Sequence, residues 1–157
     1  MGSCDGRVAI VTGAGRGLGR AHALALAAEG ARVVVNDLGV SREGEEERSV
    51  PAEEVVAEIR DLGGEAVADG ADVADWDQAA SMVARAIDTW GRLDTLVCNA
   101  GFLRDRMLAT MSEDDWDAVV RVHLKGHFAP ARHAIAHWRE RTKVGEVVAA
   151  RGGMTSS

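Results

Sequence analysis

The sequence contains no tyrosine, and its other aromatic residues are only four tryptophans and two phenylalanines. It has just two cysteines, Cys4 and Cys98, and they lie far apart. Two isolated cysteines form neither a metal-binding pattern nor a disulfide framework. We therefore expect reduced thiols, with Cys98 serving as a small core residue, and a cytoplasmic location.

Long apolar runs are also missing, so no segment is expected to span a bilayer. Residues 1–6 lack the basic flank and apolar core of a signal peptide. The net charge is −7, and an acidic chain is a poor match for nucleic-acid phosphates. From these absences we expect that the protein binds neither a membrane nor a nucleic acid.

The chain has 157 residues, of which 46% are hydrophobic and 27% are charged. These values are ordinary for a soluble globular protein, and the length fits one domain with a core of its own.

The most informative pattern lies between residues 7 and 37. An apolar strand at residues 8–11 leads into a glycine-rich loop at residues 12–19, and a helix is expected from about Gly17 to Glu29. A second apolar strand at residues 32–35 leads to Asp37, 18 residues after Gly19. This order predicts a βαβ unit.

The chemistry of this unit suits a dinucleotide. Glycines let the backbone approach a pyrophosphate closely, and a helix N-terminus offers unpaired N–H groups and a positive dipole end. A carboxylate at Asp37 can accept hydrogen bonds from a ribose. The alternative is a plain βαβ turn without a ligand.

Strand and helix patterns alternate through the rest of the chain. Helices are expected from Pro51, after a capping box at residues 75–78, and from Ser112, where Pro130 should kink the helix or be absorbed near a bend. Strands are expected at residues 65–69 and 93–98, and residues 151–157 would make a poor fifth strand. The fold class is therefore α/β, a Rossmann-type, doubly wound parallel sheet in three layers with about five strands.

Three motifs together resemble the short-chain dehydrogenase/reductase family. They are the loop from Thr12 to Gly19, the pair Asp72-Val73 and the segment Cys98-Asn99-Ala100-Gly101. The resemblance implies that residues 1–157 are the N-terminal part of one NAD(P)-binding Rossmann domain. It implies cofactor-binding roles for Thr12, Gly13, Gly15, Arg16, Gly17, Leu18, Gly19, Asp37, Asp72, Val73, Asn99, Ala100 and Gly101.

Segments 35–39, 103–106, 112–117 and 122–126 are similar to a narrower branch, the (3R)-hydroxyacyl-CoA dehydrogenase unit of peroxisomal multifunctional enzyme type 2 and its bacterial relatives. This similarity implies hydride transfer between NAD(P) and a secondary alcohol or ketone, such as a 3-hydroxyacyl thioester. It also implies a homo-oligomer in the full-length protein.

The choice of cofactor depends on two residues of opposite charge. Arg16 is the kind of residue that favours a 2′-phosphate, whereas Asp37 repels one and can bind a free ribose hydroxyl. Asp37 is expected at the ribose, so NAD is expected and NADP is the less favoured alternative.

The resemblance also defines what the chain lacks. The family's acid–base chemistry uses a serine and a Tyr-x-x-x-Lys motif, and only the serine has a counterpart, Ser157. We therefore expect a C-terminally truncated chain, with Ser157 as its catalytic residue. The alternative function is a non-catalytic nucleotide-binding fragment.

Histidines offer one further candidate site. His123 and His127 are four positions apart, as are His133 and His137, and such pairs can hold a metal. Without a pattern for a third ligand, we expect no metal site. His123 stands where most of the family has asparagine, a position whose backbone role would survive the change, so it is not expected to be the catalytic base.

Overall fold

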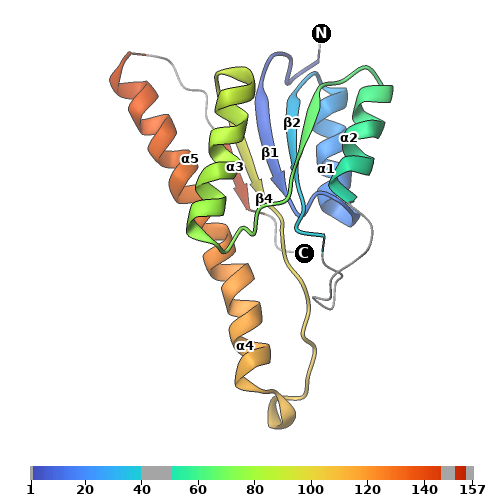
Figure 1. The fold of residues 1–157 in the computed structure, drawn as a ribbon, viewed down its shortest axis with the longest axis vertical. Helices are drawn as coiled ribbons and strands as arrows, with labels where there is room; N and C mark the ends of the chain where they lie inside the picture. Colours follow the sequence, from blue (N-terminus) through green and yellow to red (C-terminus); the bar gives the residue numbers. More distant parts are fainter. Residues whose placement is uncertain (1, 40–50, 146–150, 155–157) are drawn as a thin grey trace.

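A computed structural model describes residues 2–39, 51–145 and 151–154. Five parallel strands form one sheet in the order β3-β2-β1-β4-β5 (Figure 1). The strands are β1 (Val8–Thr12), β2 (Arg32–Asn36), β3 (Ala66–Asp69), β4 (Thr95–Cys98) and β5 (Arg151–Met154). The helices are α1 (Gly17–Ala28), α2 (Pro51–Asp61), α3 (Trp76–Trp90), the 3₁₀ turn η1 (Leu108–Thr110), α4 (Glu113–Val120), the π-helical η2 (Arg121–Lys125) and α5 (Gly126–Lys143).

The sheet is buried on both faces, which explains its apolar strands. All five residues of β1 are buried, and Ile10 pairs with Val34 of β2 and Leu96 of β4. The sequences of parallel strands that helices cover on both sides are nearly continuous apolar runs. The α/β fold class expected from the sequence is confirmed.

Alternate side chains of the strands enter two cores, because successive residues of a strand point to opposite faces. Val11 and Val33 pack with Ile59 of α2, on the face that α1 and α2 cover. Ile10 packs with Met82 of α3, on the face that α3 and α5 cover (Figure 1). The result is three layers.

The strand order reverses between β1 and β4. From β1 the chain proceeds outward through β2 and β3, and it then returns to β4 on the other side of β1. In open parallel sheets, ligands bind in the crevice beyond the carboxyl ends of the strands at such a switch point. The topology therefore places a crevice beside the glycine loop.

The capping box expected at the start of α3 forms only in part. The Asp75 carboxylate caps the helix by accepting hydrogen bonds from the N–H groups of Asp77 and Gln78. The reciprocal bond to the Asp75 N–H is not made by Gln78. Its side-chain oxygen instead accepts the N–H of Asp72 at 3.0 Å, so Gln78 braces the preceding loop.

The long helical pattern after Ser112 is not broken at its proline. Ser112 caps α4 as expected, accepting the N–H of Asp115 at 3.1 Å. The irregularity lies earlier, in η2, where the N–H of Gly126 donates to the carbonyl of Arg121. Pro130 is buried inside α5, which continues to Lys143. The chain thus changes its hydrogen-bonding pattern before the proline.

Residues 151–154 pair with β4 despite their two glycines. Gly152 lies opposite Leu96 and Gly153 opposite Val97. A backbone ladder needs no side chains, so β4 can recruit a segment of low strand propensity. The fifth strand, expected to be a poor one, therefore forms over residues 151–154 and pairs along the edge of β4.

Candidate nucleotide-binding site

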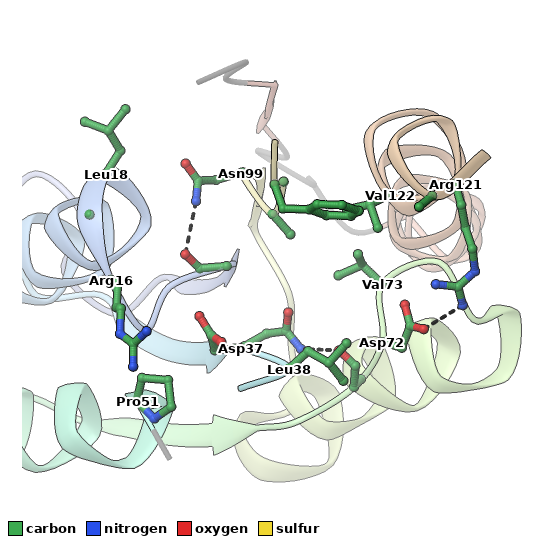
Figure 2. Close-up of a pocket in the computed structure, with 18 of the residues that line it drawn as sticks. Arg16, Leu18, Asp37, Leu38, Pro51, Asp72, Val73, Asn99, Arg121 and Val122 are labelled. Carbon is green, nitrogen blue, oxygen red and sulfur yellow. Dashed lines mark hydrogen bonds and ion pairs between the residues drawn. The ribbon is translucent and has the colours of Figure 1, made fainter. Parts of the chain in front are cut away.

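A cavity of about 650 Å³ opens at the switch point (Figure 2). It is bounded by the glycine loop, by the ends of β2 and β4, by the segment after β3 and by the start of η2. Most of the cofactor-binding residues expected from the sequence line it. These are Gly13, Arg16, Gly17, Leu18, Asp37, Asp72, Val73, Asn99, Ala100 and Gly101.

Thr12, Gly15 and Gly19 are not among the lining residues. Thr12 is fully buried, and its hydroxyl oxygen accepts the N–H groups of Asn99 and Ala100, each at 3.0 Å. Thr12 therefore joins the end of β1 to the end of β4 and shapes the cavity from behind.

Gly19 and Gly13 are required by close packing. A Cβ on Gly19 would lie 2.1 Å from the Gly13 carbonyl oxygen, and a Cβ on Gly13 would lie 2.7 Å from the Ala100 Cα. Gly13 also has a φ of +60°, which favours glycine. These contacts hold the loop, the helix and the β4 end together.

Gly15 lies against the acid at the end of β2. Its N–H donates to Asp37 Oδ2 at 2.9 Å, and the other carboxylate oxygen accepts the N–H of Gly39 at 2.9 Å. A Cβ on Gly15 would lie 2.7 Å from that Oδ2. The glycine loop thus fixes a carboxylate on the cavity wall.

The N-terminus of α1 offers hydrogen-bond donors to the cavity. Arg16 is its N-cap residue and makes no side-chain capping bond. Gly17 has a φ of +52°, and a Cβ there would meet no atom within 4 Å. The first N–H groups of a helix lack intrahelical partners and favour an anion. This end of the cavity therefore suits a phosphate group.

The opposite wall carries an ion pair. Arg121 Nη2 of η2 lies 2.6 Å from Asp72 Oδ2, and Asp72 Oδ1 accepts the N–H of Ala74 at 2.8 Å (Figure 2). Val73 lies between this pair and the β4 end of the cavity. Asp72 and Arg121 are 49 residues apart, so no sequence spacing signals their contact.

Asn99 acts largely within the fold. Its side-chain N–H₂ donates to the carbonyls of Thr12 and Gly13, each at 3.1 Å, and only 9% of the residue is exposed. Asn99 therefore lines the cavity, as expected of a cofactor-binding residue, and also has a structural role that the motif alone does not reveal.

Two histidines hold the loop that follows β4. His123 Nε2 lies 2.9 Å from the Phe102 carbonyl oxygen, and His127 Nε2 lies 3.3 Å from that of Ala100. A Cβ on Gly101 would lie 2.6 Å from the His123 ring. Sequence reasoning gave His123 only a backbone role, whereas its side chain also contacts the cavity loop.

The remaining expectations from the sequence concern Cys98, metal ligands, membrane-spanning helices and Ser157. Burial raises the pKa of the Cys98 thiol to about 11, which suits a core residue. Within the described residues, no three His, Cys, Asp or Glu side chains are grouped as metal ligands, and no helix has the length and apolar character to cross a membrane. Ser157 lies outside the described residues.

Several cavity residues were not singled out from the sequence. They are Asn36, Leu38, Pro51, Ala71, Phe102, Arg104, Ala118, Arg121 and Val122. Pro51, Asn36 and Leu38 adjoin expected elements, and their position could have been inferred from the topology. The residues of α4, of η2 and of the loop before α4 reach the cavity through long-range packing, for which the sequence carries no local signal.

Comparison with known proteins agrees with this geometry. The family model of the short chain dehydrogenases matches residues 7–154. The peroxisomal multifunctional enzyme type 2 of Mus musculus is 51% identical over 87% of the chain, which covers 18% of that enzyme. A hydroxyacyl-CoA dehydrogenase of Mycobacterium tuberculosis is 46% identical over 90% of the chain, which covers 43% of that protein.

Two crystal structures are also similar. A short chain dehydrogenase from Mycobacterium avium has a TM-score of 0.91 and 60% identity over 99% of the chain, covering 54% of that structure. A short chain dehydrogenase from Burkholderia cenocepacia in complex with NADP has a TM-score of 0.75 and 36% identity over 85% of the chain, covering 51% of that structure.

The chain belongs to the short-chain dehydrogenase family. The family resemblance stated from the motifs is thereby confirmed, including the likeness to peroxisomal multifunctional enzyme type 2. The chain spans about half of the length of the two solved structures and less than half of the two relatives.

Proposed function

We propose that the chain supplies the nucleotide-binding part of an NAD(P)-dependent short-chain oxidoreductase. The supporting observation is that one cavity brings together the glycine loop, Asp37, Asp72-Val73 and the Asn99–Gly101 loop. When bound, a nicotinamide cofactor would supply the centre that accepts or donates hydride.

Each wall of the cavity has a role in this proposal. The α1 N-terminus at Arg16 and Gly17 receives the pyrophosphate, because unpaired N–H groups and the helix dipole favour negative charge there. Asp37 accepts hydrogen bonds from the adenosine ribose, and Asp72 with Val73 holds the adenine edge. The Asn99–Gly101 loop forms the floor toward the nicotinamide half.

NAD is the proposed cofactor, although the Burkholderia cenocepacia relative is a complex with NADP. The reason is Asp37, whose carboxylate is held on the cavity wall by the N–H groups of Gly15 and Gly39. Like charges about 4 Å apart repel by roughly 4 kcal/mol at an intermediate dielectric, so Asp37 disfavours a 2′-phosphate. Arg16 offsets part of this repulsion.

A calorimetric titration of Asp37→Asn tests this choice. Asparagine keeps one side-chain oxygen for the Gly15 N–H, gives up the bond to the Gly39 N–H and removes the charge. The variant should bind ADP-ribose more weakly and 2′-phospho-ADP-ribose more tightly than the parent chain. Asp88→Asn, on the exposed face of α3, is the matched control. An equal change for both nucleotides would separate Asp37 from the ribose.

The proposed substrate is a small molecule with a secondary alcohol or ketone, such as a 3-hydroxyacyl thioester. The support is the likeness to a hydroxyacyl-CoA dehydrogenase and to peroxisomal multifunctional enzyme type 2. Reduction of a panel of 3-oxoacyl-CoA and simple ketone substrates by a full-length relative of this sequence would test the assignment.

We further propose a homo-oligomer for the full-length protein and a cytoplasmic location. Large apolar side chains on α4, η2 and α5 are exposed, namely Trp116, Leu124, Phe128 and Ile135. Both cysteines are free thiols, which is usual in a reducing compartment. Sedimentation of Phe128→Asp against the parent chain tests the first point, because a variant that associates equally would remove this face from the interface.

A further inference from the structure

We propose that Arg121 is a positioning residue that fixes the Asp72 carboxylate and thereby sets the selectivity of the cavity for the purine base. This inference rests on the proposed function, because it concerns the base of the nucleotide that the cavity is proposed to bind. The observation that carries it is the 2.6 Å contact between Arg121 Nη2 and Asp72 Oδ2 on the cavity wall (Figure 2).

The carboxylate of Asp72 is held at both of its oxygens. Arg121 donates to Oδ2, and the Ala74 N–H donates to Oδ1 at 2.8 Å. The backbone of Asp72 is held as well, because its N–H donates to the Gln78 side chain. An ionised carboxylate offers about four acceptor positions, so acceptor capacity remains for a ligand. Its direction is fixed by the two bonds already made.

The two members of the pair differ in exposure. The Asp72 side chain is 17% exposed and that of Arg121 is 48% exposed, so solvent reaches the guanidinium more readily than the carboxylate. An exposed ion pair adds little to stability. Its more specific effect is geometric, because the bond from Arg121 Nη2 to Oδ2, together with the Ala74 bond to Oδ1, restricts the rotation of the carboxylate.

The position of Arg121 in the fold supports the same role. It is the first residue of η2, where the helix changes to π-helical hydrogen bonding, and it also lines the cavity. Irregular π segments within helices occur frequently at functional sites. The Arg121 side chain thus links the continuous helix formed by α4, η2 and α5 to the loop between β3 and α3.

A fixed carboxylate discriminates between purines by hydrogen-bond polarity. Adenine presents an exocyclic amino donor, which a carboxylate accepts, whereas hypoxanthine presents a carbonyl acceptor at the same position. A carboxylate released from Arg121 can turn away, and the adenine nucleotide then loses more affinity than its hypoxanthine analogue. Because Arg121 acts through Asp72, its effect should vanish when Asp72 is neutralised.

Calorimetry with ADP-ribose and with inosine diphosphate ribose, the hypoxanthine analogue, tests the proposal on the 157-residue chain. Arg121→Met should weaken ADP-ribose binding about fivefold and change binding of the analogue less than twofold. In an Asp72→Asn background the same substitution should change either affinity less than twofold. Arg139→Met, on an exposed part of α5 outside the cavity, is the control and should match the parent.

Any of four outcomes would overturn the proposal. An equal loss for both nucleotides, or a loss that persists in the Asp72→Asn background, would mean that Arg121 contacts the nucleotide directly. Unchanged affinities in Arg121→Met would remove its role while leaving the proposed function intact. Failure of the folded parent chain to bind either nucleotide would overturn the proposed function together with this inference. If Arg121→Met does not melt cooperatively, Arg121→Lys, which keeps the charge but loses the planar guanidinium and its Nη2 donor, gives the same comparison with a smaller expected loss.

Discussion

The hydroxyl oxygen of Thr12 accepts backbone N–H groups from both Asn99 and Ala100, each at 3.0 Å. The Asn99 side chain returns two bonds, to the carbonyls of Thr12 and Gly13. The ends of β1 and β4, 87 residues apart in the chain, are thus joined at the point where the cavity opens. The motif residues Thr12 and Asn99 hold the two walls in register.

Replacing Thr12 should therefore affect stability more than its size suggests. Thr12→Val keeps the shape but leaves the buried N–H of Asn99 and the partly buried N–H of Ala100 without this acceptor, which should lower the free energy of unfolding by about 1–3 kcal/mol. Thr12→Ser keeps the oxygen and should cost about 1 kcal/mol or less for its lost methyl group. Urea unfolding measures both. Equal values for the two variants would show that the hydroxyl bonds contribute nothing measurable.

The glycines of the loop should differ in their tolerance of alanine. Gly19→Ala places a Cβ 2.1 Å from a backbone carbonyl oxygen and should prevent cooperative folding or shift the melting temperature strongly downward. Gly17→Ala meets no neighbouring atom, so it should cost only the strain of a positive φ, about 1–2 kcal/mol. Thermal melts rank the two variants. A milder effect of Gly19→Ala would contradict the packing seen around Gly13.

Stability should fall in alkaline solution because of Cys98. Burial raises the pKa of its thiol from an ordinary value of 9.0 to about 11. Between these values the unfolded chain releases the thiol proton while the folded chain retains it, so the free energy of unfolding should decrease on the order of 2 kcal/mol as pH rises. The lack of tyrosine removes phenols that would titrate in the same range.

Denaturant unfolding at several pH values from 8 to 11 measures this effect. Cys98→Ala serves as the control, since it removes the titrating group and should flatten the decline even though it lowers stability at every pH. A parent chain and a Cys98→Ala variant with parallel pH profiles would show that another group is responsible.

The 157-residue chain should bind nucleotide without turning over substrate. General acid–base catalysis by a positioned group contributes typically 10²–10⁴-fold in rate, and this sequence has no tyrosine to move the proton. NADH production from a 3-hydroxyacyl-CoA should stay at the background rate in a fluorescence assay. Steady NADH formation that is lost in Ser157→Ala would contradict this expectation and assign catalysis to Ser157.

The order of most helices and strands was readable from the sequence because these elements have strong local patterns. The apolar run of β1 and the glycine loop before α1 are examples. The ends of β1, β2 and α1 fall within one residue of the expected limits. Local patterns of apolar residues, glycines and caps were sufficient for this part of the fold.

Features that depend on distant contacts were not readable. Pro130 was expected to kink the helix or to be absorbed near a bend, and the position of the irregularity could not be told from the sequence. The helix becomes π-helical over Arg121–Lys125, before the proline, and α5 then continues through Pro130 to Lys143. Gly152 and Gly153 suggested a poor strand, yet the free edge of β4 recruits them. The Arg121–Asp72 pair and the contact of His123 with Phe102 join elements whose proximity only the fold determines.

Binding of ADP-ribose to the purified chain is the most direct test of the nucleotide site. Isothermal titration calorimetry of the folded protein should give a single saturable site, and Asp37→Asn should weaken it while Asp88→Asn leaves it unchanged. Circular dichroism on the same samples confirms that each variant is folded. A flat titration of folded parent chain with ADP-ribose, at protein concentrations that would reveal millimolar affinity, would contradict the assignment of this cavity to a dinucleotide.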